Sequence, residues 1–170
     1  MALIVEVKGD KPMWGEGCFL APNATLAGRC VLGDDCSIWF GAVLRADVDE
    51  IRIGNRVNVQ DCACVHQSGG APCVLDDDVS VGHGAVVHGA HIHRGALVGM
   101  NATVLDGAEV GEGAIIAAGA VVTQGTMVPP REIWAGIPAR RVKDCREGQA
   151  EEFAKHYSGY LKDWYLEKEG

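Results

Sequence analysis

A large aliphatic residue recurs every six positions through most of the chain, and this period restricts the possible folds more than any other feature. We call each of these residues a rung. The rungs form four runs of constant spacing: Leu20, Leu26, Leu32, Ile38 and Leu44; Ile53, Val59 and Val65; Leu75, Val81 and Val87; and Ile92, Val98, Val104, Val110, Ile116 and Val122. A small side chain such as Cys30, Cys36, Ala63 or Ala102 stands four positions after nearly every rung, which assigns both cysteines to a core. Neither helical spacing nor simple alternation produces such a pair, whereas short strands that turn a corner every six residues do.

The interruptions of the period indicate a triangular cross-section. Successive rungs are nine residues apart from Leu44 to Ile53, ten from Val65 to Leu75 and five from Val87 to Ile92. Counted from Leu32, each interruption comes after a complete set of three rungs. If three rungs make one coil of a prism, all the interruptions fall at one corner, where a loop can leave the stack undisturbed. Leu32, Ile38 and Leu44 are then the first, second and third rungs of one coil. The sequence therefore predicts an all-β solenoid built from hexapeptide repeats.

The aromatic residues support a narrow interior. None of the ten lies between Phe40 and Trp134, although that segment is rich in aliphatic residues, alanine and glycine. Large rings are common in ordinary globular cores, so their absence fits coils that pair one aliphatic side chain with one small one.

The composition argues against several partners and locations. A net charge of -8 disfavours nucleic acid as a partner. No apolar run is long enough for a membrane span, and residues 1–10 lack the features of a signal peptide. Seven cysteines without a disulfide framework suit a reducing compartment. We expect a cytoplasmic protein.

One domain is expected to span residues 1–170. The coils would occupy about residues 14–123, followed by a loop and return segment over 124–146. Residues 147–168 are expected to form an amphipathic helix, because apolar residues recur there at intervals of three and four: Ala150, Phe153, Tyr157, Leu161 and Trp164. This C-terminal α-helix should pack along the prism.

The rung positions bring polar residues of distant segments into columns. The residue after the third rung of three successive coils is Arg45, His66 and His88 in turn. Two positions after the stacked second rungs of two coils stand Asp61 and His83. His66 and His88 therefore share one column, whereas His83 projects from another face together with Asp61.

Two imidazoles one strand apart can bind one metal, because tetrahedral zinc holds its nitrogens about 3.4 Å apart. His83 cannot easily join His66 and His88 within one chain, so a three-histidine site requires a neighbouring subunit. A closed threefold trimer would make three such sites. Three protein ligands leave a fourth position open, as in catalytic zinc sites. The other three histidines, His91, His93 and His156, have no stacked partner in this scheme and are expected to be solvated.

Several runs resemble the γ-class carbonic anhydrases and their close bacterial relatives: Val43–Asp47, Asn58–Asp61, Val65–His66, Val81–His83 and Val87–Gly89. The match covers roughly residues 10–145. The hexapeptide period is similarly typical of the left-handed parallel β-helix, and the handedness is implied by that resemblance. The resemblance implies that His66, His83 and His88 bind Zn²⁺, or Fe²⁺ or Co²⁺, between the subunits of a homotrimer.

The resemblance also implies roles for the neighbouring residues. A metal-bound hydroxide would hydrate CO2 to bicarbonate, Gln60 would orient it, and Asn58 would hold water or bicarbonate nearby. Arg45 would pair with Asp47 and, across the interface, with Asp61. Purely structural ion pairing explains these three charged residues equally well.

The chain differs from the best-studied branch of that family, which carries an acidic loop for proton transfer. The loop after Leu44 offers only Asp49 and Glu50, and the insertion over residues 67–73 contains no carboxylate. We therefore expect weak carbonic anhydrase activity. Tyr157 or Tyr160 could replace the acidic loop, although the sequence places neither near the metal.

Three other functions remain open. The same metal hydroxide could hydrolyse an acyl-CoA thioester. A hexapeptide acyltransferase is a further alternative, because such enzymes carry a segment like Trp134–Arg140. The chain could also form a metal-binding trimer without catalysis.

Overall fold

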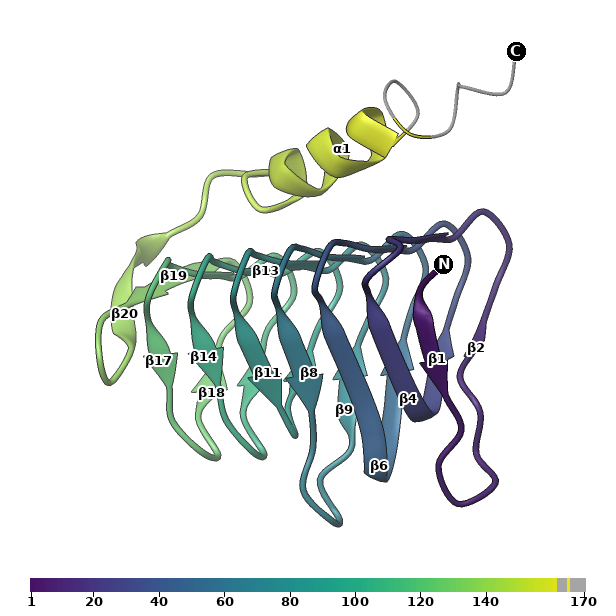
Figure 1. The fold of residues 1–170 in the computed structure, drawn as a ribbon. Coiled ribbons are helices and arrows are strands. Elements are labelled where there is room, and N and C mark those ends of the chain that lie inside the picture. Colours follow the sequence, from purple (N-terminus) through teal and green to yellow (C-terminus); the bar gives the residue numbers. More distant parts are fainter. Residues whose placement is uncertain (162–164, 166–170) are drawn as a thin grey trace.

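The computed structural model describes residues 1–161 and 165, which form a parallel β-solenoid with a C-terminal helix (Figure 1). The fold confirms the predicted all-β solenoid. One face of the coil, the second-rung face, is an eight-stranded sheet. Its strands are β3 (Phe19–Leu20), β5 (Ser37–Ile38), β7 (Asn58–Val59), β10 (Ser80–Val81), β13 (Leu97–Val98), β16 (Ile115–Ile116), β19 (Glu132–Ala135) and β20 (Arg140–Asp144). All pair in parallel except β19 with β20.

The other two faces belong to a twelve-stranded sheet that folds around a corner. Two long strands, β4 (Thr25–Leu32) and β6 (Val43–Ile53), run through the corner and contribute to both faces. The third-rung face adds β1 (Leu3–Val5), β8 (Cys64–His66), β11 (Val86–His88), β14 (Thr103–Val104) and β17 (Val121–Val122). The first-rung face adds β2 (Met13–Trp14), β9 (Cys73–Leu75), β12 (His91–Ile92), β15 (Glu109–Val110) and β18 (Met127–Val128).

The interior consists of the predicted pairs of large and small side chains. Rungs such as Leu44, Val65 and Val87 are fully buried, and so are Cys30 and Cys36. Neighbouring strands are aligned so that rung pairs with rung: Val65 pairs with Leu44 on one side and with Val87 on the other. Stacked strands are only about 4.8 Å apart, so a wide ring has no room between layers.

The coils extend beyond the expected range of residues 14–123. At the N-terminal end, β1 already pairs with β4. In the expected loop segment 124–146, Val128 stacks on Val110 and Trp134 stacks on Ile116, so the period continues through β18 and β19. The residues that looked irregular in sequence therefore complete a further coil, which β20 closes by antiparallel pairing.

Helix α1 (Glu151–Tyr160) packs along the prism as predicted, over the second-rung face, and begins four residues later than expected (Figure 1). Ala150, just before it, is buried with Leu97 and Ile115 of that face. The ring of Tyr157 packs edge-on against Trp39 at 5.2 Å between centroids. Phe153, expected on the packed side, is instead 48% exposed. Trp164 and the end of the expected helix lie outside the described residues. No helix in the described chain is long and apolar enough to cross a membrane.

A glycine lets the backbones of two coils approach closely just before His83. A Cβ atom on Gly82 would lie 2.7 Å from the backbone nitrogen of Met100 and 2.9 Å from the carbonyl oxygen of Val98. Contacts below 3.0 Å with backbone atoms cannot be relieved by a side-chain rotation. The turn that carries His83 is therefore tightly packed on the next coil.

Candidate metal centre

His66 and His88 lie side by side on the third-rung face, because β8 and β11 pair in register. The Nδ1 atom of His66 is 3.0 Å from the Nε2 atom of His88. The remaining nitrogen of each ring faces a carboxylate: Nε2 of His66 is 3.1 Å from Asp47, and Nδ1 of His88 is 2.6 Å from Asp106. Both rings are partly buried.

Asp47 links His66 to Arg45. The guanidinium of Arg45 donates a 2.6 Å hydrogen bond to Asp47, so the predicted pairing of these two residues is confirmed. Desolvation opposes ionisation of Asp47, but hydrogen bonds from Arg45 and His66 outweigh it and hold its pKa below the usual range. An ionised carboxylate can only accept, so the ring nitrogen of His66 that faces Asp47 carries the hydrogen.

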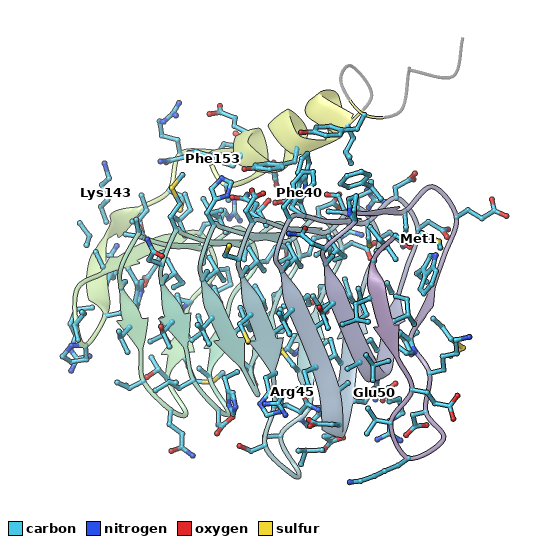
Figure 2. All side chains as sticks on the ribbon, in the orientation of Figure 1. Met1, Phe40, Arg45, Glu50, Lys143 and Phe153 are labelled. Carbon is cyan, nitrogen blue, oxygen red and sulfur yellow. The ribbon has the colours of Figure 1, made fainter. Side chains whose placement is uncertain are left out.

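The third predicted ligand, His83, lies in a different column. Its Nδ1 atom is 2.8 Å from Asp61, and its Nε2 atom is 2.7 Å from the hydroxyl of Tyr157. Arg45 belongs to the column of His66, and Phe40 belongs to the column of His83, because Phe40 and His83 each stand two positions after a second rung. Figure 2 shows Arg45 and Phe40 on opposite sides of the solenoid, with Phe40 beneath α1. One chain therefore does not bring the three histidines together.

Two buried amides support the turn of His83. The amide group of Gln60 donates to the side-chain oxygen of Asn58 at 2.9 Å, and Asn58 donates to the hydroxyl of Ser80 at 2.7 Å. The oxygen of Gln60 accepts from the backbone N–H of His83 at 3.2 Å. Asn58, Gln60 and Ser80 are each less than 5% exposed. This chain of hydrogen bonds connects the predicted polar residues to the proposed ligand.

The donor set fits a transition metal. Each of the three histidines has one ring nitrogen on a carboxylate, Asp47, Asp61 or Asp106, so the lone pair of a neutral ring lies on the other nitrogen. In this chain the Tyr157 hydroxyl contacts that nitrogen of His83. Such carboxylate partners fix the tautomer and orientation of metal-binding histidines. In the His66 and His88 pair the two remaining nitrogens face each other close to the separation that a tetrahedral metal requires.

Three features of these histidines are not among the sequence predictions. Asp106 was not considered, although it stands eighteen residues after His88, which is one coil length. The contact of Tyr157 with His83 has no sequence signal, because it depends on where α1 packs. His91 and His93 were expected to be solvated without stacked partners. That expectation is wrong, since both contact Asp76.

Comparison with known proteins agrees with this architecture. The family model described as bacterial transferase hexapeptide (six repeats) matches residues 15–46 and 89–124. The crystal structure of a hexapeptide transferase family protein from Anaplasma phagocytophilum is similar with a TM-score of 0.90, at 33% identity over 95% of this chain and 98% of that one. An acetyltransferase from Vibrio cholerae, at 20% identity and a TM-score of 0.56, shares the fold. The chain is thus a hexapeptide-repeat protein.

The curated relatives narrow the family. A Methanocaldococcus jannaschii protein named "Probable carbonic anhydrase" is 50% identical over 84% of this chain and 90% of its own length. The protein named carbonic anhydrase from Geobacillus kaustophilus is 39% identical over 94% of this chain and 88% of its own length. The chain belongs to the γ-class carbonic anhydrase-like family.

Proposed function

We propose that this chain is a metal-dependent enzyme of the carbonic anhydrase type, which hydrates CO2 to bicarbonate. The observation that carries the proposal is the pairing of His66, His83 and His88 with one carboxylate each, which leaves three ring nitrogens for a metal. Three imidazoles suit Zn²⁺, and Fe²⁺ or Co²⁺ would also be accepted. When bound, such a metal lowers the pKa of coordinated water to about 7 and supplies a nucleophile at neutral pH.

The proposed assembly is a homotrimer. Because His83 stands in a different column from His66 and His88, a second copy of the chain must bring it to them. In a closed threefold arrangement, every subunit contributes His66 and His88 to one metal site and His83 to the next. Arg45 and Asp61 would then face each other across the interface. We also propose a cytoplasmic location, which seven free cysteines suit.

The chain's own polar residues would orient the reactants. Gln60 uses its oxygen and one amide hydrogen in hydrogen bonds to described residues. We propose that its second amide hydrogen orients a reacting water at the subunit interface. Asn58 holds the amide of Gln60 in place. The hydroxyl of Tyr157 contacts His83 at Nε2, the ring nitrogen that does not face Asp61, and it would move off that nitrogen when a metal binds there. We propose that this hydroxyl moves protons in place of the acidic loop that the best-studied γ-class branch carries.

The test compares three activities on the same Zn²⁺- and Fe²⁺-loaded samples: CO2 hydration, acyl-CoA hydrolysis and acyl transfer to an added acceptor. We expect CO2 hydration, reduced at least about 100-fold by His88→Asn, because even indirect disturbance of a ligand costs 10- to 100-fold. The exposed Glu112→Gln change is the matched control and should leave the rate unchanged.

The other outcomes would each contradict the proposal. Thioester hydrolysis without hydration would assign the metal centre to a thioesterase. Activity only with an acyl acceptor would assign it to an acyltransferase. Loaded metal with none of these activities would leave a metal-binding trimer without catalysis.

A further inference from the structure

A second cluster of metal-binding side chains lies on the first-rung face, away from the candidate metal centre. His91 begins β12 and His93 directly follows it, one on each side of the buried rung Ile92, so both side chains point outward on the same face. Asp76 follows β9, the neighbouring strand on one side, and Glu109 begins β15 on the other. The cluster therefore joins three successive coils.

The contacts within the cluster converge on Asp76. One carboxylate oxygen of Asp76 is 3.0 Å from Nε2 of His91, and the other is 3.4 Å from Nδ1 of His93. The two imidazole rings are 3.9 Å apart between centroids. One ligand atom from each of these three residues lies within 4.8 Å of the other two, and within the part of the chain that the structure describes this is the one such group of three.

His93 has a carboxylate at each of its ring nitrogens. Nδ1 faces Asp76, and Nε2 is 3.3 Å from Glu109. A neutral imidazole has only one N–H, so it can donate to only one of the two. If Glu109 accepts this hydrogen, Nδ1 presents a lone pair toward Asp76, and a cation between them would satisfy both. Glu109 then has the position of the outer carboxylate that orients a metal-binding histidine.

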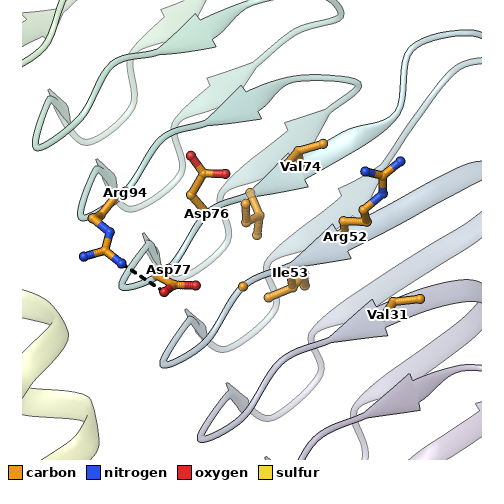
Figure 3. A pocket seen from close by; sticks show the side chains of 9 residues that line it. Val31, Arg52, Ile53, Val74, Asp76, Asp77 and Arg94 are labelled. Atoms are coloured by element: carbon orange, nitrogen blue, oxygen red, sulfur yellow. Dashed lines mark hydrogen bonds and ion pairs between the residues drawn. The ribbon is translucent and has the colours of Figure 1, made fainter.

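The two arginines near Asp76 form ion pairs with other carboxylates. Arg94 pairs with Asp77 at 3.1 Å, and Figure 3 shows the carboxylate of Asp76 apart from that pair. Arg52, which lines the same groove, pairs with Glu50 at 3.0 Å. The side chains of His91, His93 and Asp76 are 32–37% exposed, so an ion can reach them from solvent while they remain held by the coil.

We propose that Asp76, His91 and His93 form a second metal site, oriented by Glu109, which binds a divalent transition metal of the Zn²⁺, Co²⁺ or Ni²⁺ class. Two imidazoles and one carboxylate favour these ions over Mg²⁺ and Ca²⁺, which prefer oxygen ligands. The bound ion connects β9 to β12 and so stabilises the stack of coils. This site is independent of the proposed catalytic function.

The test uses a chain in which the candidate metal centre has been removed by His66→Asn and His88→Asn. We expect this chain, passed through a desalting column after Co²⁺ loading, to retain about one ion with a visible absorption spectrum. Adding His91→Asn and His93→Asn should abolish retention. Asp76→Asn should weaken Co²⁺ binding about 10-fold or more, whereas Asp77→Asn, the same change one residue away, should leave it intact.

Loss of Co²⁺ binding must be distinguished from loss of the fold. Circular dichroism and gel filtration check that every variant is folded. If removal of His66 and His88 disturbs assembly, the comparison is made between the unmodified chain and its His91→Asn/His93→Asn variant, where retention should fall by about one ion per chain. In the His66→Asn/His88→Asn background, folded chains that retain no Co²⁺, or that retain it without His91 and His93, would overturn the proposal. In the unmodified background, equal retention with and without His91 and His93 would overturn it. Failure of CO2 hydration would not affect it.

Discussion

At the scale of single residues, the proposed function depends on which nitrogen of each imidazole meets a carboxylate. Asp47, Asp61 and Asp106 each contact one histidine at 2.6–3.1 Å. Because an ionised carboxylate only accepts hydrogen bonds, such a contact favours the tautomer whose ring hydrogen faces the carboxylate and leaves a lone pair on the other nitrogen for the proposed metal. Sequence predicted the three histidines and two of these carboxylates, whereas the role of Asp106 required the observed contact.

This role of Asp106 is testable by Asp106→Asn. Asparagine keeps the shape but can present an amide N–H to His88, so the tautomer that leaves Nε2 unprotonated loses its support. We expect metal affinity at the candidate centre to fall about 10- to 100-fold, as measured by competition with a chromophoric chelator. Glu112→Gln, a charge-matched change at an exposed position, is the control. Unchanged affinity in Asp106→Asn would show that the contact does not orient a ligand.

At the scale of elements, the six-residue period determines which side chains fill the narrow interior of the coil. Each face of a coil contributes one large inward side chain, and each corner contributes a small one, so the interior between Phe40 and Trp134 is filled without aromatic rings. The small residues matter as much as the rungs, because Ala102, Ala114 and Ala120 are fully buried. The period also explains why His66 and His88 could be placed from sequence: stacked rungs force the residues after them to stack.

Enlarging a small corner residue should therefore destabilise the solenoid. Ala102→Leu would force extra volume into a filled layer, and we expect the free energy of unfolding to fall by about 1–3 kcal/mol, measured by urea denaturation. Ala118→Leu places the same side chain on an exposed turn and should change it by less than about 0.5 kcal/mol. Equal effects of the two changes would contradict the narrow-core explanation.

At the scale of the whole molecule, the coil separates residues that the proposed chemistry needs together. The columns of His66 and His83 stand on different faces, and α1 covers the second of them with Tyr157 against His83. In the proposed trimer, His83 of one subunit would lie beside His66 and His88 of another.

Mixed trimers test this assembly. His66→Asn and His83→Asn chains should each bind little metal at the candidate centre. Trimers assembled from an equal mixture should recover about a quarter of the sites, because one chain supplies intact His66 and His88 and its neighbour supplies intact His83. A mixture of His66→Asn and His88→Asn chains is the control, since both changes damage the same half-site. Lack of recovery in proven mixed trimers, or equal recovery in the control, would refute a shared site.

The sequence by itself determined the solenoid, the faces and the columns of polar residues, because a six-residue period is a local steric requirement repeated along the chain. The coils also continue through Val128 and Trp134 at the same six-residue spacing, although Pro129 and Pro130 indicate a loop there. Only the tertiary structure decided that Tyr157 reaches His83 and that His91 and His93 share Asp76. The physical reason is that these contacts depend on side-chain rotation and on how α1 packs on the coil. The spacing of residues along the chain carries no information about either.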